Sequence, residues 1–267
     1  VQMEALLAPQ IQAAFGENHS YCDVHTAVTP FDRVDYDARV PGAGTFRQTF
    51  ECFGRLLHNE KTAHQGPVYS EGLNHWWYAG LTDGNYAQMN TARPPEEPLF
   101  PDFDLLKLHP LEMDAGMGSP GMFYRASSLH NYRQFIATTL AYGHIGFLEG
   151  SDEQLMQIYY LLQPLQEHYV MVPVERIAYE FGGRLLPTSA AMAHPEWDQG
   201  ERRLYVMYEN GFRVWVNGGR DDWEIDAGAA GRLHLPPWGF AAFDAAGSVM
   251  SSSTHVRPVA ADDALAR

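Results

Sequence analysis

The sequence predicts an α/β part followed by an all-β part. The first is the C-terminal half of a (β/α)8 TIM barrel over residues 1–182, and the second is an antiparallel β-sandwich over residues 183–260, followed by a tail at 261–267. Two observations predict this division. Short apolar runs alternate with amphipathic helical patterns up to about residue 180. Beyond about residue 188, strand-like runs follow one another with turn residues between them.

In the first part, apolar runs and helical patterns take turns along the chain. The expected strands are residues 21–28, 67–72, 103–113 and 144–150, with 176–181 as a fifth strand or as the first strand of the next part. The expected helices are residues 46–61, 131–143 and 152–169. Such alternation is typical of parallel βα units. Because no glycine-rich phosphate-binding turn follows any strand, half a barrel is favoured over a doubly wound sheet.

The second part is rich in β-forming residues. Two such runs flank Asn210-Gly211, a dipeptide that favours a hairpin. Further runs follow at residues 223–226, 231–244 and 248–259. Short strands at this spacing predict an antiparallel domain of the sandwich type.

Composition narrows the classes of function. The chain has 267 residues and a formal net charge of −15, which argues against binding nucleic acid, because a phosphate backbone attracts a basic surface. No apolar run approaches the roughly 20 residues that span a bilayer.

Cys22 and Cys52 are expected to be buried free thiols. The chain begins without Met or a signal peptide, which suggests a truncated sequence and leaves its localisation open, with secreted or periplasmic as candidates.

Carboxylates follow two successive strands of the expected barrel. Catalytic residues of such barrels lie at the C-terminal ends of strands, a rule that selects Asp23 and His25 after one strand and Glu71 after the next. The third and fourth strands add His109, Glu112, Asp114 and Glu149. Glycoside cleavage needs two carboxylates, one at the anomeric carbon and one to protonate the leaving oxygen. Alternatively, these acids cap loops or pair with Arg33 or Arg39.

Two further groups of residues follow the first two strands. His75, Trp76, Trp77 and Tyr78 come directly after Glu71, where they would line a sugar subsite or form a hydrophobic plug on the barrel rim. An acidic loop follows the first strand and contains Asp32, Asp35 and Asp37. Spaced oxygens can bind Ca²⁺, but the loop has no EF-hand pattern, so a solvated loop is favoured. No metal centre or cofactor is expected otherwise.

The motifs YCDVHTAVTPFDRVDYD, GPVYSEGLNHWWYAGLTDGNYAQ and FDLLKLHPLEMDAGMG, with the later NGFRVWVNGG and LPPWGF, resemble glycoside hydrolase family 129. These enzymes are α-N-acetylgalactosaminidases related to family 101, and the resemblance covers residues 1–245. It implies a retaining mechanism on an α-linked carbohydrate, with Asp23 as nucleophile and Glu71 as acid/base. The expected substrate-binding residues are His25, His75, Trp76, Trp77, Tyr78, His109 and Asp114. The family has a complete barrel, so the missing N-terminal half is an expected partner.

Two other classes remain open. Asp23-x-His25 at a strand end also suggests a metal-dependent hydrolase of the amidohydrolase type, although that class expects a His-x-His pair on its first strand. The other alternative is a non-catalytic carbohydrate-binding relative that keeps the aromatic residues.

Overall fold

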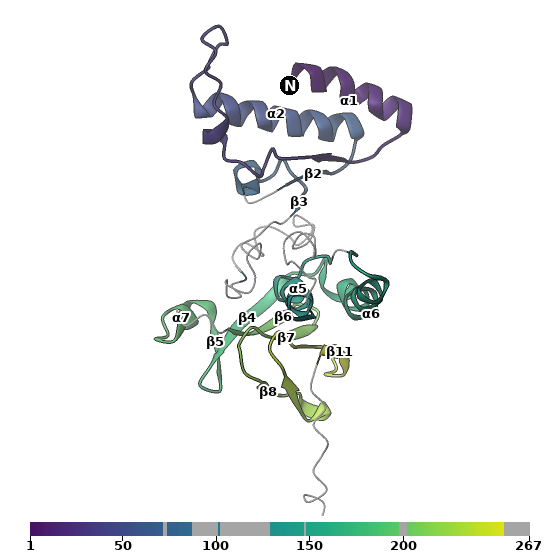
Figure 1. The fold of residues 1–267 in the computed structure, drawn as a ribbon, viewed down its shortest axis with the longest axis vertical. Coiled ribbons are helices and arrows are strands. Elements are labelled where there is room, and N and C mark those ends of the chain that lie inside the picture. Colours follow the sequence, from purple (N-terminus) through teal and green to yellow (C-terminus); the bar gives the residue numbers. More distant parts are fainter. Residues whose placement is uncertain (72–73, 87–100, 102–128, 147, 198–201, 254–267) are drawn as a thin grey trace, which may run out of the picture.

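The computed structural model describes residues 1–71, 74–86, 101, 129–146, 148–197 and 202–253. Figure 1 shows a part built from residues 1–86 above a part built from residues 129–253. The expected strand at 103–113 lies outside the described residues, as does the expected tail at 261–267.

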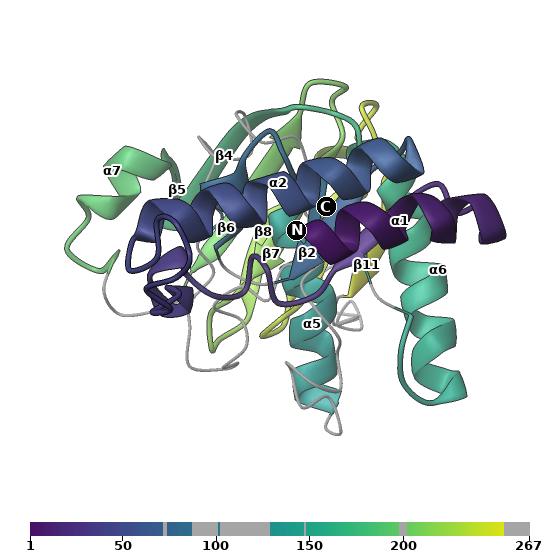
Figure 2. The same ribbon diagram turned by 90° about the horizontal axis from the view of Figure 1, so that it is seen from above.

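The N-terminal part contains a parallel sheet covered by a helix. Its elements are α1 (Gln2–Phe15), β1 (Ser20–Cys22), η1 (Pro30–Arg33), α2 (Phe46–His64), β2 (Val68–Glu71), η2 (His75–Tyr78) and β3 (Gly84–Tyr86). The strands lie in the order β1-β2-β3, and both pairings are parallel. Leu57 of α2 packs with Cys22 and Val68 in a small core. Helix α1 lies alongside α2 (Figure 2). The first two expected strands are therefore present and parallel, although β1 is shorter than predicted.

The ends of α2 explain how the chain enters β2. The Thr45 side chain caps the N-terminus by accepting a hydrogen bond from the Gln48 N–H at 3.3 Å. Gln65 ends the helix in the left-handed conformation, with φ 53°. Gly66 follows, and a Cβ there would lie 1.7 Å from the Asn18 carbonyl oxygen. Only glycine therefore lets the chain before β1 approach the start of β2 this closely.

The C-terminal part is a large antiparallel sheet with two long helices. Its elements are α5 (Leu129–Tyr142), α6 (Asp152–Tyr169), β4 (Val174–Phe181), β5 (Arg184–Pro187), α7 (Thr188–Met192), β6 (Arg203–Tyr208), β7 (Arg213–Asn217), β8 (Trp223–Asp226), η6 (Gly228–Ala230), β9 (Arg232–Leu235), β10 (Phe240–Phe243) and β11 (Val249–Ser253). Six strands form one sheet in the order β11-β10-β7-β6-β4-β5, and β8 pairs with β9. The hairpin predicted at Asn210-Gly211 is confirmed, because it joins β6 to β7.

Alternating side chains of this sheet face two different layers. Val214 and Val216 of β7 share the main core with Phe135 of α5 and Leu162 of α6. Trp215, between the two valines, packs into a second core with residues of the β8–β9 ribbon. Figure 1 shows α5 and α6 on one side of the sheet and β8 on the other. The sheet is thus covered by helices on one face and by a two-stranded ribbon on the other, instead of by a second sheet of similar size.

One expected strand is absent. Residues 144–150 were expected to form the fourth barrel strand, but the described residues of this stretch form a link between α5 and α6. The His144 carbonyl accepts a hydrogen bond from the buried Tyr169 hydroxyl at 2.8 Å, and Gly146 lies against Leu162. The apolar run is therefore held by packing against α6, and among the described residues no strand pairs with it. Glu149 lies exposed in this link.

The boundary between the parts also differs from the expected position at residue 183. β4 begins at Val174 and pairs antiparallel with both β5 and β6. Helices α5 and α6, expected to belong to the barrel, share the main core with this sheet.

Neither Cys22, which is buried, nor Cys52, which is half-buried, forms a disulfide. In the described part of the chain, no helix is both long and apolar enough to cross a membrane.

Candidate functional site

Asp23 and Glu71 lie at the same end of two neighbouring parallel strands. The last paired residues of β1 and β2 are Cys22 and Ser70, and each acid directly follows its member of that pair. The two acids are linked through Val24, whose backbone N–H donates to Glu71 Oε2 at 3.2 Å. Parallel strands present their C-terminal ends at one edge of a sheet, which is where the sequence placed both acids.

The chain turns sharply after Asp23. The His25 N–H donates to the Asp23 carbonyl at 2.8 Å, which closes a three-residue turn with Val24 at its centre. Val24 has φ 66°, a conformation that a β-branched residue rarely adopts. This turn ends β1 and fixes the direction in which the chain leaves Asp23.

The end of β2 holds this turn through side-chain hydrogen bonds. Ser70, which is fully buried, donates from Oγ to the Cys22 carbonyl and accepts from the Thr26 N–H at 3.2 Å. The Thr26 hydroxyl donates to the Glu71 carbonyl. Asn74 donates from its backbone N–H to the Thr26 carbonyl at 2.8 Å and from Nδ2 to the Ala27 carbonyl at 3.1 Å. Both strand ends and the loops that follow them therefore form one connected network.

The two faces of the parallel sheet differ in their cover. Val68 and Ser70 are buried on the face that packs on α2, whereas Tyr69 and Glu71 alternate with them and are half-buried. Tyr21 is the register partner of Tyr69 and is 49% exposed. Since successive side chains of a strand point to opposite faces, Tyr21, Tyr69 and Glu71 lie on the face away from α2.

His25 lies beside Asp23, one of the two acids. Its Nδ1 is 2.8 Å from the Asp23 carbonyl oxygen, and its ring meets Phe53 of α2 edge-on with centroids 4.9 Å apart. Because a carbonyl can only accept, Nδ1 carries the proton in this arrangement. His25 is thus fixed by its own turn and by α2, and it remains partly exposed.

Trp77 and Tyr78 were both expected to line a sugar subsite, but both pack against α2. Tyr78 is fully buried in the core between α2 and the sheet, which corrects the expectation that it contacts substrate. Burial raises the pKa of its hydroxyl to about 12. Trp77 packs edge-on against Phe46 and Phe50 of α2, with centroids 5.2 and 6.4 Å apart. Both residues therefore pack as hydrophobic side chains against α2.

The remaining predicted site residues lie in different parts of the chain. His75 is half-buried in η2, after the end of β2. The side chain of Trp76 lies outside the described part, as do His109, Glu112 and Asp114. Glu149 is exposed in the link between α5 and α6, within the C-terminal part. The structure thus brings together Asp23, His25 and Glu71.

The acidic loop does not gather its oxygens around one point. Asp32 accepts from the Thr29 hydroxyl at 3.0 Å, and Asp35 accepts from the Asp37 N–H at 2.8 Å. Asp37 itself pairs with Arg39 at 2.6 Å, which lowers the pKa of its carboxyl group. Among the described residues, no group of three or more His, Cys, Asp or Glu side chains is placed to hold a metal ion.

Sequence reasoning missed the residues that hold the two strand ends together. Ser70, Thr26 and Asn74 make the hydrogen bonds of the network, yet none has a charge or a motif that would identify it. The available signal was position. Ser70 is the residue before Glu71 and Thr26 is three residues after Asp23, so both are small hydroxyl residues near strand ends, where unpaired backbone groups need partners.

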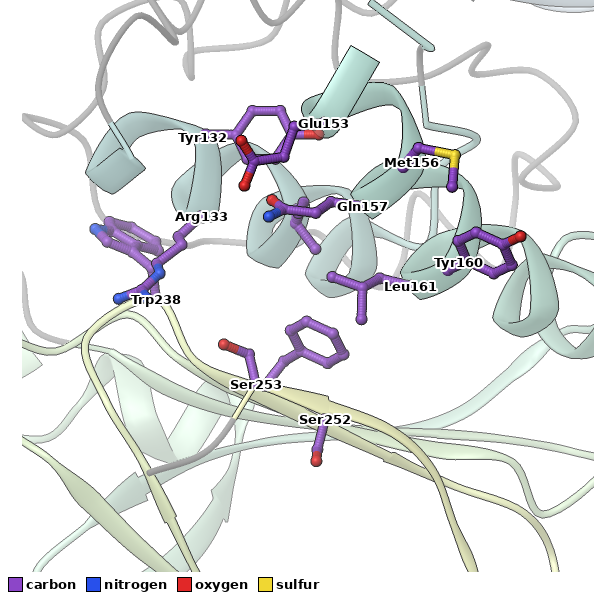
Figure 3. Close-up of a pocket in the computed structure, with 12 residues that line it drawn as sticks. Tyr132, Arg133, Glu153, Met156, Gln157, Tyr160, Leu161, Trp238, Ser252 and Ser253 are labelled. Atoms are coloured by element: carbon purple, nitrogen blue, oxygen red, sulfur yellow. The ribbon is translucent and has the colours of Figure 1, made fainter. Parts of the chain in front are cut away.

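A separate pocket lies in the C-terminal part (Figure 3). It has a volume of about 480 Å³ and opens between α5, α6 and the β10–β11 edge of the sheet. Its lining residues are Tyr132, Arg133, Ile136, Glu153, Met156, Gln157, Tyr160, Leu161, Trp238, Phe240, Ser252 and Ser253. None comes from the ends of β1 or β2, so this pocket is distinct from the acidic pair.

No protein-family model matches the chain, and no curated protein matches it in sequence. Function is therefore inferred from the residues themselves and from their geometry.

Proposed function

We propose that this chain carries the catalytic carboxylates of a retaining glycoside hydrolase that acts on α-linked sugars, with Asp23 as nucleophile and Glu71 as acid/base. One observation supports this assignment most strongly. Asp23 and Glu71 directly follow the paired residues Cys22 and Ser70 on parallel strands, and Val24 links the two acids through its N–H bond to Glu71. Two carboxylic acids at the ends of neighbouring parallel strands supply the two groups that this chemistry requires.

The reaction divides between the two acids. The Asp23 carboxylate attacks the anomeric carbon as the glycosidic C–O bond breaks, while Glu71 gives a proton to the leaving oxygen. Glu71, now ionised, takes a proton from a water molecule that attacks the same carbon, and the bond to Asp23 breaks. Two displacements at one carbon retain its configuration. Retaining enzymes hold these carboxyl groups about 5–5.5 Å apart.

The surroundings of the acids suit a sugar. Tyr21 and Tyr69 lie on the same face of the sheet as Glu71, away from α2, and Tyr21 is substantially exposed. Aromatic rings with a polar edge can pack against a sugar ring and hydrogen-bond its hydroxyl groups. His25 offers a further polar group beside Asp23. The choice of an α-N-acetylgalactosaminide as substrate rests on the family resemblance alone.

We also propose that the N-terminal part belongs to a (β/α)8 barrel. In a (β/α)8 barrel, helices cover the outside of the sheet and catalytic groups lie at the C-terminal end of the strands. The parallel pairing of β1 with β2, the cover of α2 on one face and the position of both acids support this proposal, whereas β2 reaches β3 through the short η2 instead of through an α-helix. Tyr21 and Tyr69 would then face its interior.

The test uses the complete open reading frame that encodes this sequence, assayed on aryl α-N-acetylgalactosaminides with good and poor leaving groups. Asp23→Asn should abolish turnover of every substrate. Glu71→Gln should spare substrates with good leaving groups, because these need little protonation, and added azide should then yield a glycosyl azide of retained configuration. Glu51→Gln, on the exposed surface of α2, is the matched control and should remain fully active.

Three results would contradict the proposal. Full activity of Asp23→Asn would exclude this residue as the nucleophile. A folded wild-type protein that binds these sugars without cleaving them would favour the non-catalytic alternative. Loss of activity on removal of a stoichiometric transition metal would instead favour the metal-dependent alternative.

A further inference from the structure

The turn after Asp23 is strained and needs support. Val24 lies at φ 66°, and the His25 N–H bonds back to the Asp23 carbonyl across it. A β-branched residue in this conformation persists only where the surrounding structure holds it there. The support must therefore come from groups that contact the turn on both sides of Asp23.

Ser70 makes contacts on both sides. Its hydroxyl donates to the carbonyl of Cys22, the residue before Asp23, and accepts from the N–H of Thr26, which lies beyond the turn. A serine hydroxyl has one donor and two acceptor positions, so it can serve both groups at once. Ser70 and Thr26 are both fully buried. Water therefore does not replace either bond without a structural change.

We propose that Ser70 is a positioning residue, whose hydroxyl fixes the strained turn and so holds Asp23 at its place beside Glu71. This inference rests on the proposed function. Ser70 touches neither substrate nor the reacting atoms. It acts through the two backbone groups that flank Asp23, and it is the residue directly before Glu71 on β2. One side chain thereby ties the nucleophile to the strand that carries the acid/base.

Removal of the hydroxyl should displace Asp23. In Ser70→Ala, the Cys22 carbonyl and the Thr26 N–H both lose a buried partner, and the turn can relax away from φ 66°. A shift of about 1 Å at a catalytic group can slow a reaction roughly 100-fold. Because the nucleophile is misplaced, the loss should be similar for good and poor leaving groups. Glu71→Gln differs in that it spares the good ones.

The experiment compares Ser70→Ala, Ser70→Thr and Thr49→Val in the complete protein. Thr49 is the matched control, since its buried hydroxyl also donates to a backbone carbonyl, that of Arg33 at 3.1 Å. We expect Ser70→Ala to lower kcat by about 10- to 100-fold with both leaving groups and little change in KM. Ser70→Thr keeps the hydroxyl and should recover most of this loss. Thr49→Val should lower Tm but leave kcat unchanged.

Hydrogen exchange supplies a readout independent of activity. The Thr26 amide should lose protection in Ser70→Ala but keep it in Thr49→Val. If Ser70→Ala does not fold, Ser70→Cys takes its place, because a thiol is a far weaker hydrogen-bonding group of similar shape.

The outcomes distinguish failure of the positioning role of Ser70 from failure of the proposed function. An active wild type, an inactive Asp23→Asn and a Ser70→Ala enzyme with normal kcat would overturn the positioning role and leave the proposed function intact. A Ser70→Ala enzyme slowed only with poor leaving groups would also overturn it, because that pattern points to Glu71. An inactive wild type would overturn the proposed function, and the positioning role with it.

Discussion

At the scale of single residues, identical chemical types have different roles because of their neighbours. Tyr21 lies in β1 and is 49% exposed, whereas Tyr78 lies at the end of η2 and is fully buried. The difference lies in α2, whose Phe50 stacks on Tyr78 with centroids 5.4 Å apart. A sequence shows that aromatic residues follow Glu71 but not which of them a distant helix will cover.

The strain at Val24 gives a direct prediction. Glycine adopts positive φ without steric cost, whereas the left-handed conformation costs an L-residue about 1–2 kcal/mol. Relief of this strain outweighs the entropic cost of introducing glycine, so Val24→Gly should raise the free energy of unfolding by about 0.5 kcal/mol. Val28→Gly, a valine of the same loop without positive φ, should lower it by about 1 kcal/mol. Urea denaturation measures both. Equal destabilisation by the two variants would show that Val24 is not strained.

The acids of the candidate site could be predicted from the sequence because a simple rule applies to them. Glu71 was placed near the end of its expected strand in this way, whereas Asp23 lies within the strand expected at residues 21–28 and comes to a strand end because β1 stops at Cys22. Ser70 and Thr26 could not be identified, because their role depends on which backbone groups the pairing of β1 with β2 leaves without partners. Such groups become visible only when the register is known.

At the scale of elements, strong periodic patterns were reliable. The helix predicted at residues 152–169 matches α6 at both ends, and Ser151 and Gln154 form a reciprocal capping box at its N-terminus. The apolar run at residues 144–150 was misjudged, because such a run fits a buried strand as well as a buried link between helices. Packing of Gly146 on Leu162 decides between them, and this contact depends on tertiary structure.

The pairing of β1 with β2 depends on one glycine. A Cβ at Gly66 would lie 1.7 Å from the Asn18 carbonyl oxygen, so backbone must move before an alanine fits. We expect Gly66→Ala to lower the free energy of unfolding by about 3 kcal/mol. Gly44→Ala is the control for strain without a steric clash, because Gly44, unlike Gly66, has positive φ and has no atom within 4 Å of a new Cβ, so it should cost about 1 kcal/mol. Equal losses in chemical denaturation would remove the steric explanation.

At the scale of the whole molecule, the described residues form two parts with different sheets. The change from parallel to antiparallel pairing could be predicted, because the spacing of strands and helices changes along the sequence. Its position could not. β4 begins at Val174, and α5 and α6 pack on the antiparallel sheet, because their apolar faces meet Val206 and Val214 in one core. A pattern shows that a helix has an apolar face but not which sheet will cover it.

The central claim is that Asp23 forms a covalent bond to the sugar. It is tested most directly with a fluorinated α-N-acetylgalactosaminyl fluoride, which slows release of the glycosyl-enzyme enough for mass spectrometry of the digested protein. We predict that one sugar is attached to the tryptic peptide that ends at Arg33, with fragmentation placing it on Asp23. A sugar attached to any other carboxylate, or rapid turnover with no attached sugar at all, would contradict the assignment.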